Sequence, residues 1–274
     1  MINTFKKNLM LILLILTLTN TAYAQERLIF GTPPTQSPEI TLANYQPLVD
    51  YLSKVIGRTI VVKPAKSFFE YSHNMRAGLY DIILDGPHFV KYRIEKMHHT
   101  VLVKQAGDLK FAVVVNTNSN INNYNDLVNK KVCAPASPNL ATLTYLDLYK
   151  SPARQPTLIK IQGFKNAIKC VKTARSKAAI VPEKFWLKKV KNKIGLKVIY
   201  ITKNKMPARG LTVNKDSISV LERKKLVAAL TAKASRRLIK KAISTVGGSH
   251  FIKANQTEYT QIDSVLSQVW GFHI

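Results

Sequence analysis

The sequence alternates short runs rich in β-branched residues with stretches of helical periodicity, almost from end to end. Leu28–Gly31, Thr59–Val62 and Tyr80–Leu84 have the composition of strands, and apolar residues between Thr41 and Ile56 recur every three to four positions. Repeated strand–helix–strand units favour parallel sheets covered by helices on both faces. The predicted fold class is therefore α/β, with a final helix over Glu258–Trp270.

Two breaks in this alternation, near residues 105–110 and 203–211, divide the predicted strands into two groups. We expect two lobes, each a mainly parallel sheet flanked by helices, with two hinge crossings and a ligand cleft between the lobes. The first lobe would comprise residues 25–107, the second 108–205, and the chain would return to the first lobe over 206–274.

The N-terminal residues 1–24 have the pattern of a secretory signal peptide. Lys6 and Lys7 supply positive charge, Leu9–Leu18 is apolar, and Ala22–Ala24 is an A-x-A cleavage site. The apolar stretch is short for a bilayer-spanning helix. We therefore expect cleavage after Ala24 and export to the periplasm; an uncleaved anchor helix is the alternative.

Cys133 and Cys170 are the two cysteines of the chain. In an oxidising compartment, two cysteines in an otherwise cysteine-free chain favour a disulfide. Two buried thiols are the alternative. A catalytic thiol is less favoured, because neither cysteine has a His or Asp close in sequence.

A Pro- and Ser-containing loop links a predicted strand to a helix predicted over Pro138–Tyr149. Ser137 is a good N-cap, and Pro138 suits the first helical position. The free N–H groups of the first turn, with the hydroxyls of Ser137 and Thr142, could bind an anion. An ordinary capped helix is the alternative.

Further candidate ligand-binding residues follow the carboxyl ends of predicted strands, where open α/β sheets bind ligands. In the first lobe, His88 and Tyr92 lie one helical turn apart after Asp85. In the second lobe, Lys165 and Glu183 follow strands in the same way. A surface or core histidine, and a glutamate that favours a helix start, are the alternatives.

The chain is strongly basic, with 42 Lys and Arg against 15 Asp and Glu and a formal charge of +27. Removal of Lys6 and Lys7 with the signal peptide lowers the charge to +25. Such a charge attracts small anions and anionic membrane surfaces, although basic residues spread over solvated helix faces explain it equally. No nucleic-acid-binding motif is present, and we expect no nucleic-acid partner.

The order of these pieces resembles the phosphate/phosphite/phosphonate-binding (PhnD-like) solute-binding proteins of ABC transporters, over essentially the whole mature chain. The segments that carry the resemblance are Tyr45–Leu52, Met75–Ile82, Asp85–His88, Asp126–Val132, Gly163–Ala167 and Ala179–Glu183. The resemblance implies a type II periplasmic binding protein fold that closes on a small oxyanion and delivers it to a membrane permease.

The resemblance also implies roles for particular residues. The place of a Ser-Thr-Ser run that holds the phosphonate oxygens is taken here by Asn139–Ala141, which leaves Asn139, the nearby Ser137 and Thr142, and backbone N–H groups to bind the ligand. A His-Asp pair of the family corresponds to Lys165-Asn166. Glu183 matches the acidic residue that receives an amino group of the ligand. Tyr45 and Tyr71 lie near the aromatic positions of the first lobe. The changed Ser run affects the prediction of the ligand, whereas the prediction of the fold does not depend on it.

We therefore predict a periplasmic solute-binding protein that is not an enzyme and has no cofactor or metal. A sensory protein of the same fold, docked on a histidine kinase or diguanylate cyclase, is the alternative. The changed Ser run and the basic surface favour that alternative. An exported hydrolase is a third hypothesis, but the sequence shows no nucleophile elbow, metal motif or evident acid pair.

Overall fold

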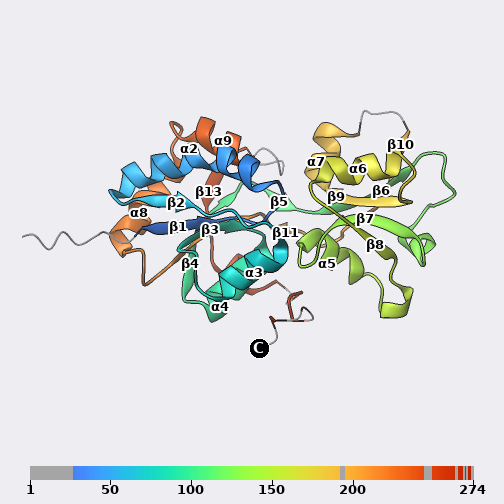
Figure 1. Cartoon of the computed structure of the whole chain (residues 1–274), viewed down its shortest axis with the longest axis horizontal. Coiled ribbons are helices and arrows are strands. Elements are labelled where there is room, and N and C mark those ends of the chain that lie inside the picture. The colour runs from blue at the N-terminus through green and yellow to red at the C-terminus, as the bar shows by residue number, and fades with distance from the viewer. Residues whose placement is uncertain are drawn as a thin grey trace, which may run out of the picture.

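The computed structural model describes residues 27–191, 195–243, 249–262, 265–267, 269 and 271–272. The predicted signal peptide, residues 1–24, lies outside the described residues. The chain forms two lobes, each built on its own sheet and covered by helices on both faces (Figure 1). Within the described ranges, no helix combines the length and apolar character needed to cross a bilayer.

The first lobe contains a six-stranded sheet. Across the sheet, its strands are β13 (Phe251–Lys253), β4 (His99–Gln105), β12 (Gly210–Asn214), β3 (Ile82–Asp85), β1 (Leu28–Gly31) and β2 (Ile60–Val62). Its helices are α2 (Pro38–Ile56), α3 (Phe68–Arg76), α4 (Pro87–Lys96), α8 (Val220–Thr231), α9 (Arg236–Ile243) and α10 (Thr257–Thr260). Helices α2 and α9 cover one face of the sheet, and α3 and α4 cover the other (Figure 1).

The second lobe contains a five-stranded sheet. Across the sheet, its strands are β10 (Leu196–Ile201), β6 (Phe111–Asn116), β9 (Ala178–Pro182), β7 (Lys131–Pro135) and β8 (Thr157–Ile161). Its helices are α5 (Leu140–Leu146), α6 (Phe164–Lys172) and α7 (Glu183–Lys189), with short 3₁₀ turns at Tyr124–Leu127 and Pro152–Arg154.

The chain crosses between the lobes twice, close to the breaks seen in the sequence. It leaves the first lobe through β5 (Asp108–Leu109) and returns through β11 (Met206–Pro207), and these two strands pair antiparallel. The crossings therefore form a two-stranded ribbon between the two sheets, visible at the centre of Figure 1.

The α/β class and the two lobes are confirmed, but the expectation of mainly parallel sheets requires a correction. The pairs β1–β2, β1–β3, β7–β8 and β7–β9 are parallel, whereas β12 runs antiparallel to β3 and β4, and β6 runs antiparallel to β9 and β10. Strands β6 and β12 follow the crossings directly, without the crossover helix that keeps successive strands parallel. The hinge therefore reverses β6 in the second sheet and β12 in the first, where the edge strand β13 also runs antiparallel to β4.

Two predicted helices are shorter than expected. The helix predicted over Pro138–Tyr149 is α5, which starts at Leu140 because the Asn139 side chain accepts the first-turn N–H of Ala141 at 3.0 Å. The helix predicted over Glu258–Trp270 ends at Thr260. Of the later residues that are described, Val269 and Phe272 donate backbone N–H groups to carbonyls three residues earlier, which closes separate turns.

Each lobe has its own apolar core. In the first lobe, the sheet packs against α2, α8 and α9, and a second cluster around Phe89 lies on the opposite face. In the second lobe, β6 and β9 contribute continuous buried runs. The predicted disulfide is present and joins Cys133 on β7 to Cys170 on α6, both buried.

The described part of the C-terminal segment touches both lobes. Leu266 and Phe272 are buried in the first-lobe cluster around Phe89, whereas Val265 packs against the core of the second lobe. This segment is therefore a third place, besides β5 and β11, where one stretch of chain reaches both lobes.

Candidate functional site

A cleft runs between the lobes and has an outer and an inner part. The outer cavity has a volume of ≈ 290 Å³ and is lined by both lobes. The inner cavity, of ≈ 70 Å³, adjoins the outer one through Thr35, Phe68 and Phe164, which line both. The outer cavity is close to the lower end of the range for small-molecule pockets, and the inner cavity extends it.

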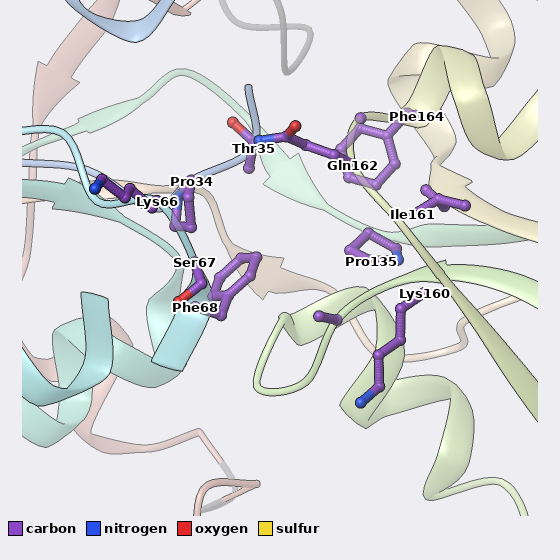
Figure 2. Close-up of a pocket in the computed structure, with 12 residues that line it drawn as sticks. Pro34, Thr35, Lys66, Ser67, Phe68, Pro135, Lys160, Ile161, Gln162 and Phe164 are labelled. Atoms are coloured by element: carbon purple, nitrogen blue, oxygen red, sulfur yellow. The ribbon is translucent and has the colours of Figure 1, made fainter. Parts of the chain in front are cut away.

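Helix α3 and the start of α6 bring apolar rings to the outer cavity. Ser67 caps α3 by accepting the N–H of Glu70 at 3.1 Å, which puts Phe68 at the first helical position. Figure 2 shows Phe68 from the first lobe facing Pro135 and Phe164 from the second across the gap. The outer cavity is thus a mainly apolar slot between two helix starts.

Positive charge borders this slot. Lys66 of the first lobe and Lys160 of the second line the outer cavity, and both are exposed. In Figure 2 the Lys66 amine extends away from the gap. Both lysines raise the electrostatic potential at the entrance of the cavity. No carboxylate of the described residues lines this cavity.

The inner cavity has aromatic and aliphatic walls with a few polar groups. Its apolar walls are formed by Pro33, Phe68, Phe89, Leu109, Phe111, Leu140, Phe164 and Pro182. The polar side chains of its lining are Thr35, His88, Gln105, Asn139 and Arg209. A small number of polar groups in an apolar cavity is typical of a ligand site.

His88 joins the two lobes across the cleft. Pro87 starts α4, so His88 lies in its first turn, and the Nε2 atom of His88 is 3.0 Å from the carbonyl oxygen of Pro138 in the second lobe. A carbonyl only accepts, so Nε2 carries the hydrogen and donates it, which leaves Nδ1 as an acceptor. Nδ1 is buried and has no partner among the described residues. Burial lowers the pKa of His88 to about 4, so the ring is neutral at pH 7.

Arg209 and Gln105 lie at the hinge end of the inner cavity. Arg209 immediately precedes β12, and Gln105 ends β4 and donates its backbone N–H to the Arg209 carbonyl at 2.9 Å. Nη2 of Arg209 donates to Thr32 Oγ1 at 2.9 Å and to the Leu84 carbonyl at 2.8 Å. Neither residue was predicted from the sequence, although Gln105 lies at the edge of one of the two breaks and Arg209 lies within the other.

Of the nine residues predicted to bind a ligand, His88 and Asn139 line the inner cavity. The Asn139 amide oxygen caps α5, and the Thr142 hydroxyl donates to the Pro135 carbonyl at 2.6 Å. Ser137 is exposed and is absent from the lining of both cavities. The predicted N-cap is therefore corrected from Ser137 to Asn139, which is equally suited to that position.

The three predicted tyrosines pack within the first lobe, where Tyr45 and Tyr71 are buried and Tyr92 is half-buried. Tyr71 is fully buried and donates to Asp85, and burial together with that carboxylate raises its pKa well above the usual value. Tyr45 packs on Phe30, and Tyr92 packs on Phe272. The prediction that these rings lie in the cleft is therefore corrected. They lie on the apolar faces of their helices, which pack against the sheet or the C-terminal segment.

Lys165 and Glu183 do not line either cleft cavity. Lys165 is exposed in the first turn of α6, and Glu183 is half-buried at the start of α7. Their neighbours Phe164 and Pro182 line the inner cavity instead. In both cases the strand end was located correctly, but the adjacent apolar residue faces the cleft.

A buried ion pair supports the strand end that leads to His88. Arg93 of α4 donates to both carboxylate oxygens of Asp85, at 2.7 and 2.5 Å, and through Nε to Thr212 at 2.9 Å. The side chains of Arg93 and Asp85 are both 0% exposed. This network fixes β3, α4 and β12 to one another below the cleft.

Comparison with known proteins identifies the fold. Residues 30–259 match the family described as the periplasmic substrate-binding protein of phosphonate ABC transporters. Among solved structures, PhnD1 from Prochlorococcus marinus in complex with methylphosphonate is similar at 17% identity, with a TM-score of 0.71, over 88% of this chain and 97% of that one.

Two further solved structures are similar. The binding-protein component of an ABC phosphonate transporter from Pseudomonas aeruginosa matches at 17% identity and a TM-score of 0.66, over 86% of this chain and 83% of that one. XAC2383 from Xanthomonas citri, bound to ATP, matches at 13% identity and a TM-score of 0.67, over 85% and 93%. No functionally curated protein matches the sequence.

The structural neighbours share the two-lobe type II periplasmic binding protein fold, and they include an arginine-binding protein at a TM-score of 0.55. The family match extends over most of the chain, from β1 to α10. The resemblance found in the sequence is thereby confirmed. The chain belongs to the family of phosphonate-binding periplasmic substrate-binding proteins of ABC transporters.

Proposed function

We propose that this protein captures a small oxyanion of the phosphonate, phosphite or phosphate class in the cleft between its lobes and delivers it to a membrane permease. The observation that carries the proposal is the inner cavity between the lobes, in which a cationic side chain meets buried polar atoms that have no partner among the described residues. The methylphosphonate of PhnD1 and the ATP of XAC2383 support a phosphorus oxyanion.

Closure of the lobes is the signal that a partner would read. The hydrogen bond from His88 to Pro138 and that from Lys184 Nζ to the Ala106 carbonyl, at 3.2 Å, both join the second lobe to the first lobe or to the hinge. A ligand that contacts both walls of the cavity stabilises this closed arrangement by differential affinity. The permease would then distinguish loaded from empty protein, without any reaction on the ligand.

Calorimetric titration of the mature protein with methylphosphonate, phosphite and phosphate tests this proposal. We expect one-site binding of at least one of them, together with a smaller radius of gyration by X-ray scattering as the lobes close. Absence of heat and of a thermal shift with all three anions, and with cell extract, would contradict the proposal. Mass spectrometry of the exported chain should show an N-terminus at Gln25.

The partner requires its own test. Deletion of the gene should abolish uptake of the bound anion, and a permease and ATPase should be encoded beside it. If uptake is unchanged and the loaded protein instead alters the activity of a histidine kinase or diguanylate cyclase, a receptor rather than a permease is the partner.

A further inference from the structure

Arg209 is a buried cation without a carboxylate partner. Arg209 is 8% exposed, and no described carboxylate lies within salt-bridge distance of its guanidinium group. Its two hydrogen bonds, to Thr32 and Leu84, both use Nη2, and no described residue accepts from Nε or Nη1. Burying a charge without a counter-charge is costly, so an anion in the inner cavity would stabilise this group.

Gln105 gives a second, independent indication of a ligand at the same place. It is 5% exposed, lines the inner cavity, and its amide Nε2 is buried without a partner. Unsatisfied buried donors of this kind are uncommon and cost free energy. Because backbone hydrogen bonding places Gln105 beside Arg209, one oxyanion can accept from both side chains.

The rest of the inner cavity is not suited to a fully charged, fully hydrated ion. Phe68, Phe89, Phe111 and Phe164 form its walls, together with four other apolar residues. His88 offers only its Nδ1 acceptor there, which can take a hydrogen from a protonated oxygen. One cation against an apolar wall fits a singly charged group attached to a small apolar body.

We infer that Arg209 and Gln105 form the anion-binding end of the cleft, and that the ligand is a small organic oxyanion whose apolar substituent lies against the phenylalanine walls. The inference deepens the proposed function and rests on it. It places the oxyanion at the hinge, near β4 and β12, rather than at the start of α5, whose first turn is already capped by Asn139. It also predicts preference for alkylphosphonates over inorganic phosphate and phosphite.

Titration with ethylphosphonate and with inorganic phosphate tests both the anion site at Arg209 and Gln105 and the preference for an apolar substituent. The wild-type protein should bind ethylphosphonate at least about tenfold more tightly than phosphate, since an ethyl group buries about two CH₂-sized units. Arg209→Gln should weaken ethylphosphonate binding by about 10–100-fold, the usual effect of removing one charge-assisted partner. Arg154→Gln, at an exposed 3₁₀ turn, removes the same charge and should leave the affinity unchanged.

Gln105→Glu keeps the test decisive if Arg209→Gln fails to fold. This near-isosteric change supplies Arg209 with an internal carboxylate, so we expect a fold at least as stable and an affinity for ethylphosphonate that is lower by at least about tenfold. If wild type binds but both variants bind equally well, Arg209 and Gln105 are not the anion site. If phosphate binds as tightly as ethylphosphonate, the inferred contact between an apolar substituent of the ligand and the phenylalanine walls is overturned. If wild type binds no oxyanion, the proposed function itself fails.

Discussion

The two lobes share an α/β architecture but stabilise their interiors differently. The first lobe buries an ion pair, Arg93 with Asp85, that is completed by Thr212 and Tyr71. Within the described residues, the second lobe buries no charged side chain. Its sheet is joined covalently to α6 through Cys133 instead.

This difference corresponds to the kind of residue that each lobe positions at the cleft. In the first lobe, the buried pair is adjacent to Gly86 and Pro87, which carry His88 into the inner cavity. A charged network is satisfied only in one arrangement, so it fixes the position of that strand end. In the second lobe, mainly apolar residues line the cleft, and apolar packing with one covalent link is sufficient to position them.

The largest expected effect comes from breaking the ion pair. Arg93→Met leaves Asp85 charged and buried, and should lower the free energy of unfolding by about 3–5 kcal/mol. Hydrogen exchange resolved by peptide should show the loss in the first lobe. Asp85→Asn in the Arg93→Met background should recover part of it. A loss below about 1 kcal/mol in the single variant would show that the pair does not hold this core.

Removing the disulfide should affect the other lobe. The bond closes a separation of 37 residues, and replacing both cysteines by Ala should lower the free energy of unfolding by about 2–4 kcal/mol. Exchange should rise in β7 and α6 and stay unchanged around Arg93. Wild-type protein treated with a reductant serves as the control without substitutions. Equal loss of protection in both lobes would contradict separate stabilisation.

Acid should destabilise the first lobe selectively. Residues 108–205 contain no histidine, whereas burial lowers the pKa of His99 to about 3 and that of His88 to about 4. Because these values lie below the unfolded pKa of about 6.5, the unfolded chain binds more protons. Stability is complete above pH 6.5 and falls as the pH drops towards 4.

Urea unfolding at pH 7 and pH 5 measures this dependence. His99→Gln should reduce the difference in unfolding free energy between the two pH values by about 2 kcal/mol. His73→Gln, at a solvent-exposed position, is the matched control and should leave the difference unchanged. An identical pH dependence in wild type and His99→Gln would remove His99 as a cause.

The smallest expected effect concerns the hydrogen-bonded tyrosines of the second lobe. The Tyr149 hydroxyl contacts Tyr145 at 2.9 Å and donates to the Tyr124 carbonyl at 2.7 Å. Tyr149→Phe should lower the free energy of unfolding by about 1 kcal/mol. Tyr51→Phe, in the first lobe, removes a hydroxyl with no hydrogen bond to the described residues and should change nothing. A loss as large as that of Arg93→Met would remove the contrast between the lobes.

The sequence was sufficient for the elements and the cleft but not for the groups that face it. Alternating periodicity located β1, β3 and α2, and the two breaks located the crossings at β5 and β11. Periodicity carries no information on strand direction, so the reversed β6 and β12 were missed. The breaks themselves contained a further signal, since Gln105 lies at the edge of one and Arg209 lies within the other.

For the candidate site residues too, the sequence predicted positions along the chain better than it predicted which side chains face the cleft. His88 was predicted from its place after a strand end, and it lines the inner cavity. Tyr71 was placed in the cleft by family resemblance, but its hydroxyl is used by Asp85. Which face of a short helix is turned inward depends on contacts far along the chain, such as that between Arg93 and Thr212, 119 positions apart.

The C-terminal segment has a consequence for how the lobes can move. A clamshell joined only by a two-stranded ribbon is free to twist as well as to open. Here Val265 packs against the core of the second lobe, while Leu266 and Phe272 are buried in the first. A segment anchored in both lobes resists rotation of one lobe relative to the other about the long axis of the molecule. The lobes would therefore open and close by a hinge motion about one axis.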